Sequence, residues 1–376
     1  MMIYTHKTYF GDIFMKKIML VFGTRPEAIK MCPLVCELRR RPNISTCVCV
    51  TGQHRAMLDE ALAAFGVKPD YDLSLMREGQ SLFDITTGVI DGMKDVLAAE
   101  KPDVVLVHGD TTSAFAAALS AYYMKIPVGH VEAGLRTHNL YSPYPEEFNR
   151  NAVDIIAKYR FCPTEKSGEN LAAEGISEGI YITGNTVIDA LKTTVKSDFS
   201  HPLLEWAGGK RLVLITAHRR ENIGEPLEKM LCGIRSAVES HPDTRAIYPV
   251  HPNPAVRKTA EKVFAGCDAV RLCEPLSVLD FHNILARCYL VMTDSGGIQE
   301  EATALGKPTL VMRNTTERPE GITSGTLRLV GTDENAVSRA LSALLDDAGE
   351  YDKMAHSACP YGDGKACVRI ADILEK

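Results

Sequence analysis

The stretch from Pro102 to Arg150, PDVVLVHGDTTSAFAAALSAYYMKIPVGHVEAGLRTHNLYSPYPEEFNR, constrains the fold more than any other part of the chain. A buried-strand run at residues 104–107 is followed by a helical apolar pattern at 114–123 and a second short strand pattern at 127–131. Strand, helix and strand in this order predict a parallel βαβ unit. Ligands of such sheets bind beyond the carboxyl ends of the strands. Asp110 and Glu132, each just past a strand end, are therefore predicted to lie at one crevice.

Further charged residues follow the second of these strands. Glu146, Glu147 and Arg150 are expected on the next loop, close to the same crevice. Two neighbouring carboxyl groups push each other's pKa values apart, which gives a site one acid and one base. The alternative for any single acid is a capping or solvated role, and Asp110, just before a helix, could be such a cap. The whole group favours proton-transfer chemistry.

The strand–helix alternation continues along the chain and predicts two successive α/β halves. The expected strands of the first half are residues 17–22, 45–51, 104–107, 127–131, 159–162 and 179–183, and those of the second are 211–216, 245–250, 269–273, 289–293, 308–312 and 327–330. Gly184-Asn185-Thr186 is predicted to be the hinge between them, and residues 1–14 an extension that is disordered or follows a non-native start. Two facing halves of this kind enclose one deep cleft.

Charge and composition exclude several classes of protein. The 376 residues carry a formal net charge of -6, which offers no electrostatic footprint for nucleic acid or an anionic membrane. No apolar run approaches the roughly 20 residues of a membrane span, and the first fourteen residues lack the apolar core of a signal peptide. The 11 cysteines include no C-x-x-C pair and no zinc spacing, so we expect free thiols, a cytoplasmic protein and no metal site.

The second half contains a candidate nucleotide site. Ser295, Gly296 and Gly297 precede a predicted helix, whose N-terminus favours a diphosphate; an ordinary helix cap is the alternative. Glu301 could accept hydrogen bonds from a ribose diol, although such a residue alone is more often solvated. His218 ends a strand and heads a charged run that suits a diphosphate. Three more cations are candidates for anion contacts, namely Arg25, Lys30 and Arg318.

Eight sequence blocks together resemble the non-hydrolysing UDP-N-acetylglucosamine 2-epimerases, over essentially the whole length after Met15. They are GTRPEAIKM (23–31), TGQHR (51–55), HGDT (108–111), HVEAGLRT (130–137), PEEFNR (145–150), TAHRREN (216–222), DSGGIQEEA (294–302) and LVMRNTTERPEG (310–321). The resemblance implies the glycosyltransferase-B architecture: two Rossmann-like domains, 15–185 and 186–357, with parallel sheets facing a central cleft and a C-terminal segment, 358–376, crossing back to the first domain. It also implies a homodimer.

The resemblance further implies a reaction without metal or redox cofactor. UDP leaves carbon 1 of UDP-N-acetylglucosamine while a base removes the proton from carbon 2, and re-addition of both to the bound 2-acetamidoglucal gives UDP-N-acetylmannosamine, a precursor of cell-surface polysaccharide. By position, the implied acid–base carboxylates are Asp110, Glu132 and Glu146, with His218 beside the leaving diphosphate. The implied substrate-binding residues are Arg25, Lys30, Arg150, Phe281, Ser295, Gly296, Gly297, Glu301 and Arg318. Gln53 and His54 match a region where many bacterial members bind a second UDP-N-acetylglucosamine as an activator.

Three other functions remain open on the sequence. A glycosyltransferase of the same architecture would share the nucleotide site but would need an acceptor pocket. A hydrolysing epimerase would release free N-acetylmannosamine and UDP. A non-enzymatic nucleotide-sugar sensor would have no reason to keep Asp110, Glu132, Glu146 and His218 together.

Overall fold

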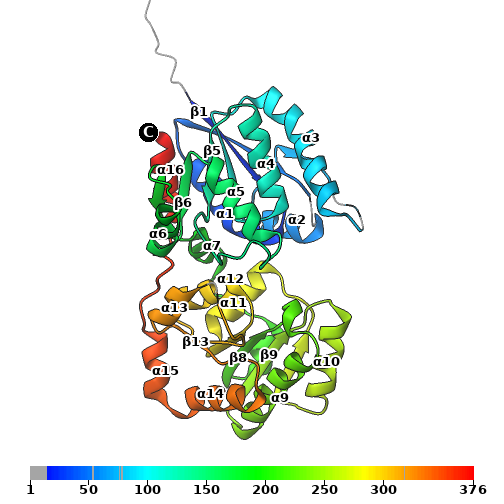
Figure 1. The fold of residues 1–376 in the computed structure, drawn as a ribbon. Coiled ribbons are helices and arrows are strands. Elements are labelled where there is room, and N and C mark those ends of the chain that lie inside the picture. Colours follow the sequence, from blue (N-terminus) through cyan, green and yellow to red (C-terminus); the bar gives the residue numbers. More distant parts are fainter. Residues whose placement is uncertain (1–14, 53–54, 76, 78, 317) are drawn as a thin grey trace, which may run out of the picture.

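A computed structural model describes residues 15–376, apart from residues 53, 54, 76, 78 and 317. The chain forms two lobes, stacked one above the other in Figure 1. Within the described part of the chain, none of the helices combines the length and the apolar character needed to cross a bilayer.

The N-terminal lobe is built on a seven-stranded parallel sheet in the order β3-β2-β1-β4-β5-β6-β7. Its strands are β1 Lys16–Phe22, β2 Ile44–Val50, β3 Tyr71–Asp72, β4 Val104–His108, β5 Val128–Val131, β6 Tyr159–Cys162 and β7 Ile180–Ile182. Its helices are α1 Arg25–Leu38, α2 Arg55–Ala64, α3 Leu82–Glu100, α4 Thr112–Tyr123, α5 Glu146–Ile156 and α6 Glu165–Ala173. The central strands are nearly continuous apolar runs because helices cover both faces of the sheet.

The C-terminal lobe repeats this plan with a six-stranded parallel sheet in the order β10-β9-β8-β11-β12-β13. Its strands are β8 Arg211–Thr216, β9 Thr244–Pro249, β10 Val270–Cys273, β11 Leu290–Thr293, β12 Thr309–Val311 and β13 Leu327–Leu329. Its helices are α8 Pro202–Ala207, the short 3-10 helix at Arg220–Asn222, α9 Glu225–Ser240, α10 Pro254–Phe264, α11 Val278–Arg287, α12 Gly296–Ala304, α13 Pro319–Thr323, α14 Glu334–Asp346 and α15 Ala348–Ala355. The two parallel sheets confirm the predicted fold class.

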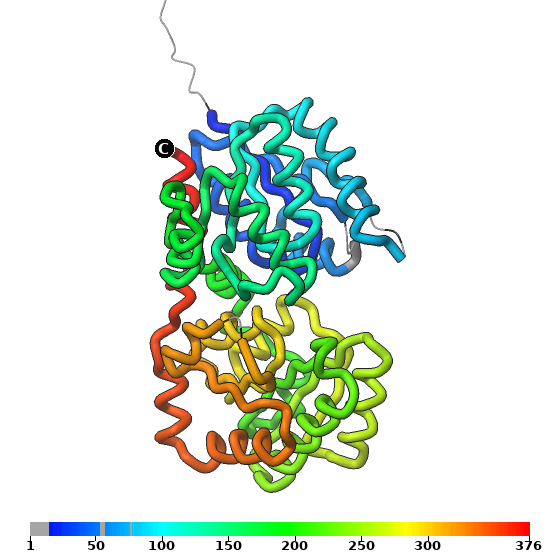
Figure 2. Tube along the Cα trace, viewed as in Figure 1, coloured from blue at the N-terminus to red at the C-terminus, as the bar shows by residue number. Residues whose placement is uncertain are grey.

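Two helices join the lobes. Helix α7, Thr186–Thr194, contacts α1 of the N-terminal lobe as well as α11 and α12 of the C-terminal lobe. Helix α16, Ala366–Glu375, returns from the C-terminal lobe to pack on α1, and the tube in Figure 2 shows this last red segment beside the N-terminal lobe. Its apolar side chains Cys367, Ile370 and Leu374 enter the same core as Leu34 and Leu38 of α1. The end of the chain thus ties the two lobes together.

The sequence patterns placed most elements within two residues of their observed bounds. Thr24 accepts a hydrogen bond from the backbone N–H of Glu27 and completes a capping box at the start of α1. The expectation that Glu146, Glu147 and Arg150 lie on a loop was wrong, because these residues form the first turns of α5. The apolar side chains that recur at helical spacing in α5, such as Phe148 and Ile155, lie on its exposed face, whereas its buried face is largely polar.

Candidate active site

Asp110 and Glu132 follow neighbouring strands, as predicted. Strands β4 and β5 pair in parallel, so their carboxyl ends open at the same edge of the sheet. Gly109, with a positive φ of 61°, turns the chain after β4, and Glu132 itself has a φ of 68°. A Cβ atom built on Gly109 would lie 3.6 Å from Glu132 Oε1, so this carboxylate lies directly against the residue before Asp110.

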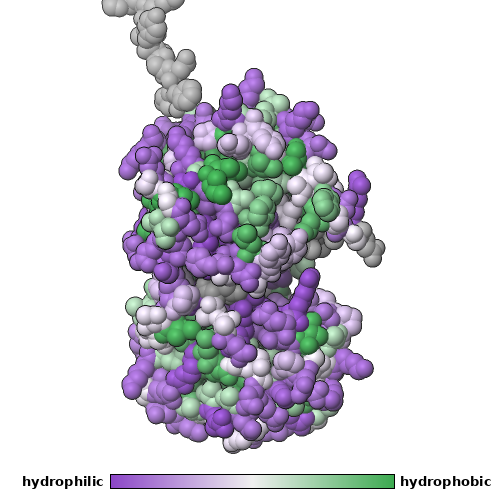
Figure 3. Space-filling view, in the orientation of Figure 1, coloured by the Kyte–Doolittle hydropathy of each residue, from purple (hydrophilic) through white to green (hydrophobic). Residues whose placement is uncertain are grey.

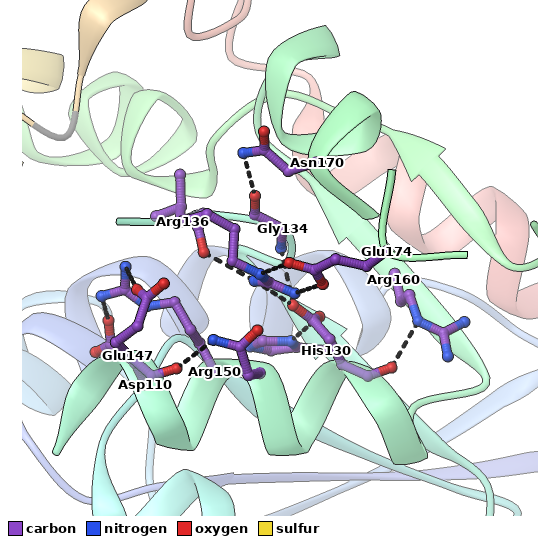
Figure 4. A network of polar contacts seen from close by, with 12 residues as sticks. Asp110, His130, Gly134, Arg136, Glu147, Arg150, Arg160, Asn170 and Glu174 are labelled. Carbon is purple, nitrogen blue, oxygen red and sulfur yellow. Dashed lines mark hydrogen bonds and ion pairs between the residues drawn. The ribbon is translucent and has the colours of Figure 1, made fainter. Parts of the chain in front are cut away.

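Helix α5 holds Asp110 from one side (Figure 4). The Arg150 guanidinium forms an ion pair with Asp110 Oδ2, and Asn149 Nδ2 donates to the Asp110 carbonyl at 2.9 Å. Arg150 also contacts Glu147 Oε2 at 3.1 Å, and the other oxygen of fully buried Glu147 accepts two backbone N–H groups, from Thr137 and from the next residue, at 2.9 Å each. The charge on Asp110 is thereby balanced and its position fixed.

Glu132 belongs to a buried cluster that spans both lobes. Lys30 of α1 forms an ion pair with Glu132 Oε2, and its Nζ lies 4.0 Å from Glu300 Oε2 on α12. Asn185, at the start of α7, donates to Glu132 at 2.9 Å and to Glu300 at 2.8 Å. Arg318 closes the cluster through an ion pair with Glu300 Oε1. Two carboxylates from opposite lobes therefore share one amide and one ammonium group.

The environment moves the pKa values of these two carboxyl groups in opposite directions. Burial opposes ionisation of Glu132, but the charges of Lys30 and Arg318 outweigh burial and hold the pKa of Glu132 well below its usual range. Burial raises the pKa of Glu300 despite the same two cations. Glu132 is therefore ionised, as a proton acceptor requires. Glu132 and Glu300 are thus two neighbouring carboxyl groups whose pKa values move apart.

His108, the last residue of β4, lies beside this cluster. Its Nε2 atom lies 3.8 Å from Glu132 Oε2. Burial lowers the pKa of His108 to about 3, with Lys30 acting in the same direction, so the ring is neutral. Because this ring is uncharged, the Glu132 charge is balanced by Lys30 and Arg318.

Glu146 and His218 lie apart from the ion-pair cluster. Glu146 is half-buried in the first turn of α5, and within the described part of the chain no group hydrogen-bonds to its carboxylate. His218 is exposed and stacks on His251 with ring centroids 5.1 Å apart. Buried Asp294 organises the His218 loop by accepting the backbone N–H groups of His218 and Arg219.

The predicted phosphate loop begins α12. The Ser295 N–H donates to Thr293 Oγ1 at 3.0 Å, so this donor already has a partner within the loop. A Cβ on Gly297 would meet nothing within 4 Å, so open space lies beside the first turn, where helix N–H groups lack partners. Deeper in α12, Glu301 is buried; among the residues described, none donates a hydrogen bond to its Oε2 atom, and His282 Nε2 lies 3.6 Å away. A buried acceptor of this kind suits ligand hydroxyl groups.

The remaining candidates lie on both sides of the junction. Arg25, at the start of α1, donates to the Leu276 carbonyl of the other lobe at 2.9 Å. Phe281 of α11 is half-buried and packs with Leu276 in one apolar cluster. Gln53 and His54 lie outside the described residues. The described residues contain no group of three or more His, Cys, Asp or Glu side chains that could hold a metal ion.

Sequence patterns missed Asn185, Glu300 and His108 as members of the site. Asn185 was predicted only as part of a hinge, and its amide bridges both lobes. Glu300 lies between two other polar residues in a single helical turn, and nothing in that pattern shows which of them faces the junction. The position of His108 at a strand end was the one available signal.

The fold and this site define a two-lobed α/β protein of the glycosyltransferase-B-like class, with Asp110 and Glu132 on one lobe and the glycine-rich start of α12 on the other. A family profile described as UDP-N-acetylglucosamine 2-epimerase matches residues 36–375. The Bacillus subtilis UDP-N-acetylglucosamine 2-epimerase is 53% identical over 359 residues, which cover 95% of this chain and 94% of the relative.

Solved structures give the same answer. The Neisseria meningitidis UDP-GlcNAc 2-epimerase bound to UDP-GlcNAc superposes with a TM-score of 0.89 at 45% identity, over 95% of this chain and 99% of the other. The Methanocaldococcus jannaschii UDP-GlcNAc 2-epimerase in complex with UDP-GlcNAc and UDP gives a TM-score of 0.81 at 32% identity, over 95% and 99% of the two chains. The chain belongs to the UDP-N-acetylglucosamine 2-epimerase family.

Proposed function

We propose that this enzyme interconverts UDP-N-acetylglucosamine and UDP-N-acetylmannosamine without hydrolysis, by elimination and re-addition of UDP. Relatives of similar length carry the epimerase name, and the Neisseria structure contains UDP-GlcNAc. The observation that carries the proposal is the ionised Glu132 at the lobe junction, bridged through Asn185 to Glu300 on the helix that begins at Gly296. In this proposal a proton acceptor of one lobe lies next to the nucleotide side of the other.

The proton balance follows from the chemistry of the sugar. Carbon 2 has no adjacent carbonyl, so departure of UDP from carbon 1 must drive loss of the carbon 2 proton to a carboxylate. The resulting 2-acetamidoglucal takes a proton on its opposite face, and UDP adds again at carbon 1. We assign these transfers to the group Asp110, Glu132 and Glu146, without dividing the two steps among them. The Lys30 ion pair keeps Glu132 ionised in the resting enzyme.

The C-terminal lobe would hold the nucleotide. The N-terminus of α12 at Gly296 and Gly297 receives the diphosphate, with His218 and Arg318 as further charge partners. The unpartnered Oε2 of Glu301 accepts the ribose hydroxyl groups. In this proposal residues 15–185 form the acid–base domain, 186–357 form the UDP domain, and 358–376 fasten the one to the other. Phe281 would pack near the uracil, and Arg25 and Lys30 would serve the junction.

Incubation with UDP-N-acetylglucosamine in heavy water tests the reaction. The proposed enzyme incorporates deuterium from the solvent at carbon 2 and forms UDP-N-acetylmannosamine. A glycosyltransferase or a sensor leaves carbon 2 unlabelled, and a hydrolysing epimerase accumulates free N-acetylmannosamine. If folded enzyme converts the substrate without incorporating deuterium at carbon 2, the proposal is wrong.

A homodimer fits an exposed apolar area on the N-terminal lobe. Figure 3 shows apolar side chains gathered over α4 and α5. Tyr122 and Tyr123 of α4 and Phe148 and Ile155 of α5 are 54%, 68%, 48% and 74% exposed. Monomers rarely leave such a patch uncovered, so we propose that a second copy packs on it in the cytoplasm. Sedimentation of Ile155→Asp tests this: the wild type is expected to be dimeric and the variant monomeric.

Regulation by substrate is a separate proposal. A second UDP-N-acetylglucosamine would bind near Gln53 and His54 and activate the enzyme, and its product would supply cell-surface polysaccharide synthesis. Initial rates with UDP-N-acetylmannosamine alone distinguish the cases. An activated enzyme requires traces of UDP-N-acetylglucosamine, whereas an unregulated enzyme follows a simple hyperbola from the start.

A further inference from the structure

Behind the Asp110 turn lies a second buried charged group that the proposed chemistry does not use. His130 of β5 and Asp154 of α5 are both fully buried. His130 Nδ1 lies 2.6 Å from Asp154 Oδ1, and His130 Nε2 lies 2.8 Å from the carbonyl oxygen of Gly109. Figure 4 shows His130 in the same network of polar contacts as Asp110 and Arg150.

The partners of the ring determine how many protons it carries. A carbonyl oxygen can only accept, so Nε2 must carry hydrogen. Asp154 Oδ2 receives the Gly134 N–H at 3.2 Å and the Arg136 guanidinium at 2.8 Å. Burial disfavours an ionised Asp154, but His130 and Arg136 outweigh burial and lower its pKa. An ionised Asp154 also only accepts, so Nδ1 must carry hydrogen too. A ring with both hydrogens is an imidazolium.

The surrounding charges compensate a buried imidazolium. Asp154 faces it from α5, and Arg136 joins Asp154 to Glu174 of α6 through bonds of 2.7 and 2.8 Å. In this chain of contacts the cations His130 and Arg136 face the carboxylates of Asp154 and Glu174, and Arg160 is a third cation nearby. Arg160 of β6 is held by the carbonyls of Asp154 and Glu178, and its pKa is lowered by burial. Two neutral groups complete the surroundings: His108 of β4 and the Cys162 thiol, whose pKa burial raises to about 12.

We propose that His130 is an imidazolium that acts as a positioning residue for Asp110, through the carbonyl of Gly109. Gly109 immediately precedes Asp110 and turns the chain with a positive φ. Its N–H donates to Val131 at 2.9 Å and its carbonyl is held by His130, so both polar groups of this one peptide residue are tied to β5. Asn149 and Arg150 hold Asp110 from the opposite side.

A neutral, purely structural histidine does not fit this geometry. With hydrogen on Nε2 alone, the Nδ1 lone pair would face a carboxylate oxygen at 2.6 Å. That contact is repulsive unless the proton moves to Asp154, and Arg136 and the Gly134 N–H both favour the ionised carboxylate. The structure therefore favours charge on the ring.

The role in catalysis rests on the proposed function of Asp110, whereas the charge on His130 does not. Nitrogen NMR of protein labelled at its 11 histidines reports the charge directly, with His130→Gln identifying the signals. An imidazolium shows two similar ring-nitrogen shifts, and a neutral ring shows a widely separated pair. We expect the imidazolium signature in the wild type at pH 7, and the neutral signature in Asp154→Asn. A neutral ring in the wild type, or an imidazolium in Asp154→Asn, overturns the proposal.

Kinetics test the positioning role. His130→Gln is expected to lower kcat about 10- to 100-fold because a small displacement of a reacting group is costly, with KM within roughly threefold of the wild type. His356→Gln, at an exposed histidine of the other lobe, should leave both constants unchanged. Unchanged kcat in folded His130→Gln overturns the positioning role.

If His130→Gln does not fold, kcat is measured in Asp154→Asn instead. The NMR spectrum of the wild type then still shows whether the His130 ring is charged. Exchange retained in Asp110→Asn would instead remove Asp110 from the chemistry and leave the spectroscopic result standing.

Discussion

The two lobes share one topology but prepare their halves of the site differently. In the N-terminal lobe, Asp110 and Glu132 each have a cationic partner before any substrate arrives. In the C-terminal lobe, Gly297 faces open space and Glu301 has an oxygen to which no described group donates. The proposed acid–base carboxylates are thus already held by ion pairs. On the proposed nucleotide side, the Oε2 atom of Glu301 still has no hydrogen-bond donor among the described residues. Electrostatic preorganisation of this kind favours catalysis, and unpaired polar groups favour binding of a specific ligand.

The contrast arises from the loops at the strand ends. After β4 and β5 the chain places acids that α1 and α5 neutralise with Lys30 and Arg150. After β11 it places Ser295 and two glycines, which bring backbone close to a ligand without side-chain bulk. Variants of the carboxylates in the N-terminal lobe should therefore lower kcat, and variants of the binding groups in the C-terminal lobe should weaken binding.

Asp110→Asn should have the largest effect. The variant keeps the shape of the side chain but cannot accept a proton, so kcat should fall about 10²- to 10⁴-fold with little change in KM. Deuterium incorporation at carbon 2 measures the loss. Asp268→Asn, at an exposed aspartate of the C-terminal lobe, is the matched control. Near-normal deuterium exchange at carbon 2 in Asp110→Asn would mean that the Asp110 carboxylate and its ion pair are structural and do not take part in the reaction.

Asn185→Asp should come next, because it replaces the shared donor with a third carboxylate. Its oxygen would lie about 2.8 Å from Glu300 and 2.9 Å from Glu132. Repulsion among buried like charges should lower the free energy of unfolding by about 3 kcal/mol and kcat by roughly 100-fold. Urea unfolding and steady-state kinetics measure both. Asn43→Asp, at an exposed asparagine, should change neither quantity. Wild-type stability in Asn185→Asp would show that the amide does not hold the lobes together.

Glu301→Gln tests the binding lobe. Losing a charged acceptor for the ribose should weaken UDP binding about 10- to 100-fold, the equivalent of roughly 1.5–3 kcal/mol, and leave kcat near the wild-type value. Calorimetry with UDP and 2′-deoxy-UDP refines the result. The wild type should discriminate between the two ligands, and the variant should bind them alike. Glu261→Gln, on exposed α10, serves as the control. Equal discrimination in Glu301→Gln and wild type would place the ribose elsewhere.

His108→Asn should have the smallest effect, on the pH dependence of stability. The pKa of His108 is about 3 in the folded protein, below the ordinary 6.5. Between these values the unfolded chain binds a proton that the folded protein does not, so stability falls as pH falls, by about 1.4 kcal/mol per pH unit. In His108→Asn this fall in stability between pH 6.5 and 4.5 should be absent, whereas His356→Gln should still show it. Parallel stability curves for wild type and His108→Asn would show that folding does not lower the pKa of His108.

The fold was readable from sequence because both sheets use apolar runs bounded by glycines and polar turns. The positions of Asp110 and Glu132 followed from the strand-end rule alone. The burial of α5 was not readable, because its apolar side chains Phe148 and Ile155 are exposed and its buried face consists of charged and amide groups such as Glu147, Asn149 and Asp154. The bridging amide of Asn185 was not readable either, because contacts between lobes depend on how two separate sheets dock, and no local pattern encodes that.

The most direct test of the account is a crystal structure of the enzyme with UDP-N-acetylglucosamine. We expect the diphosphate at Gly296 and Gly297 and carbon 2 of the sugar roughly 3–3.5 Å from a carboxylate oxygen of Asp110, Glu132 or Glu146. A sugar ring that points away from all three carboxylates, with the nucleotide bound in the same complex, would contradict it.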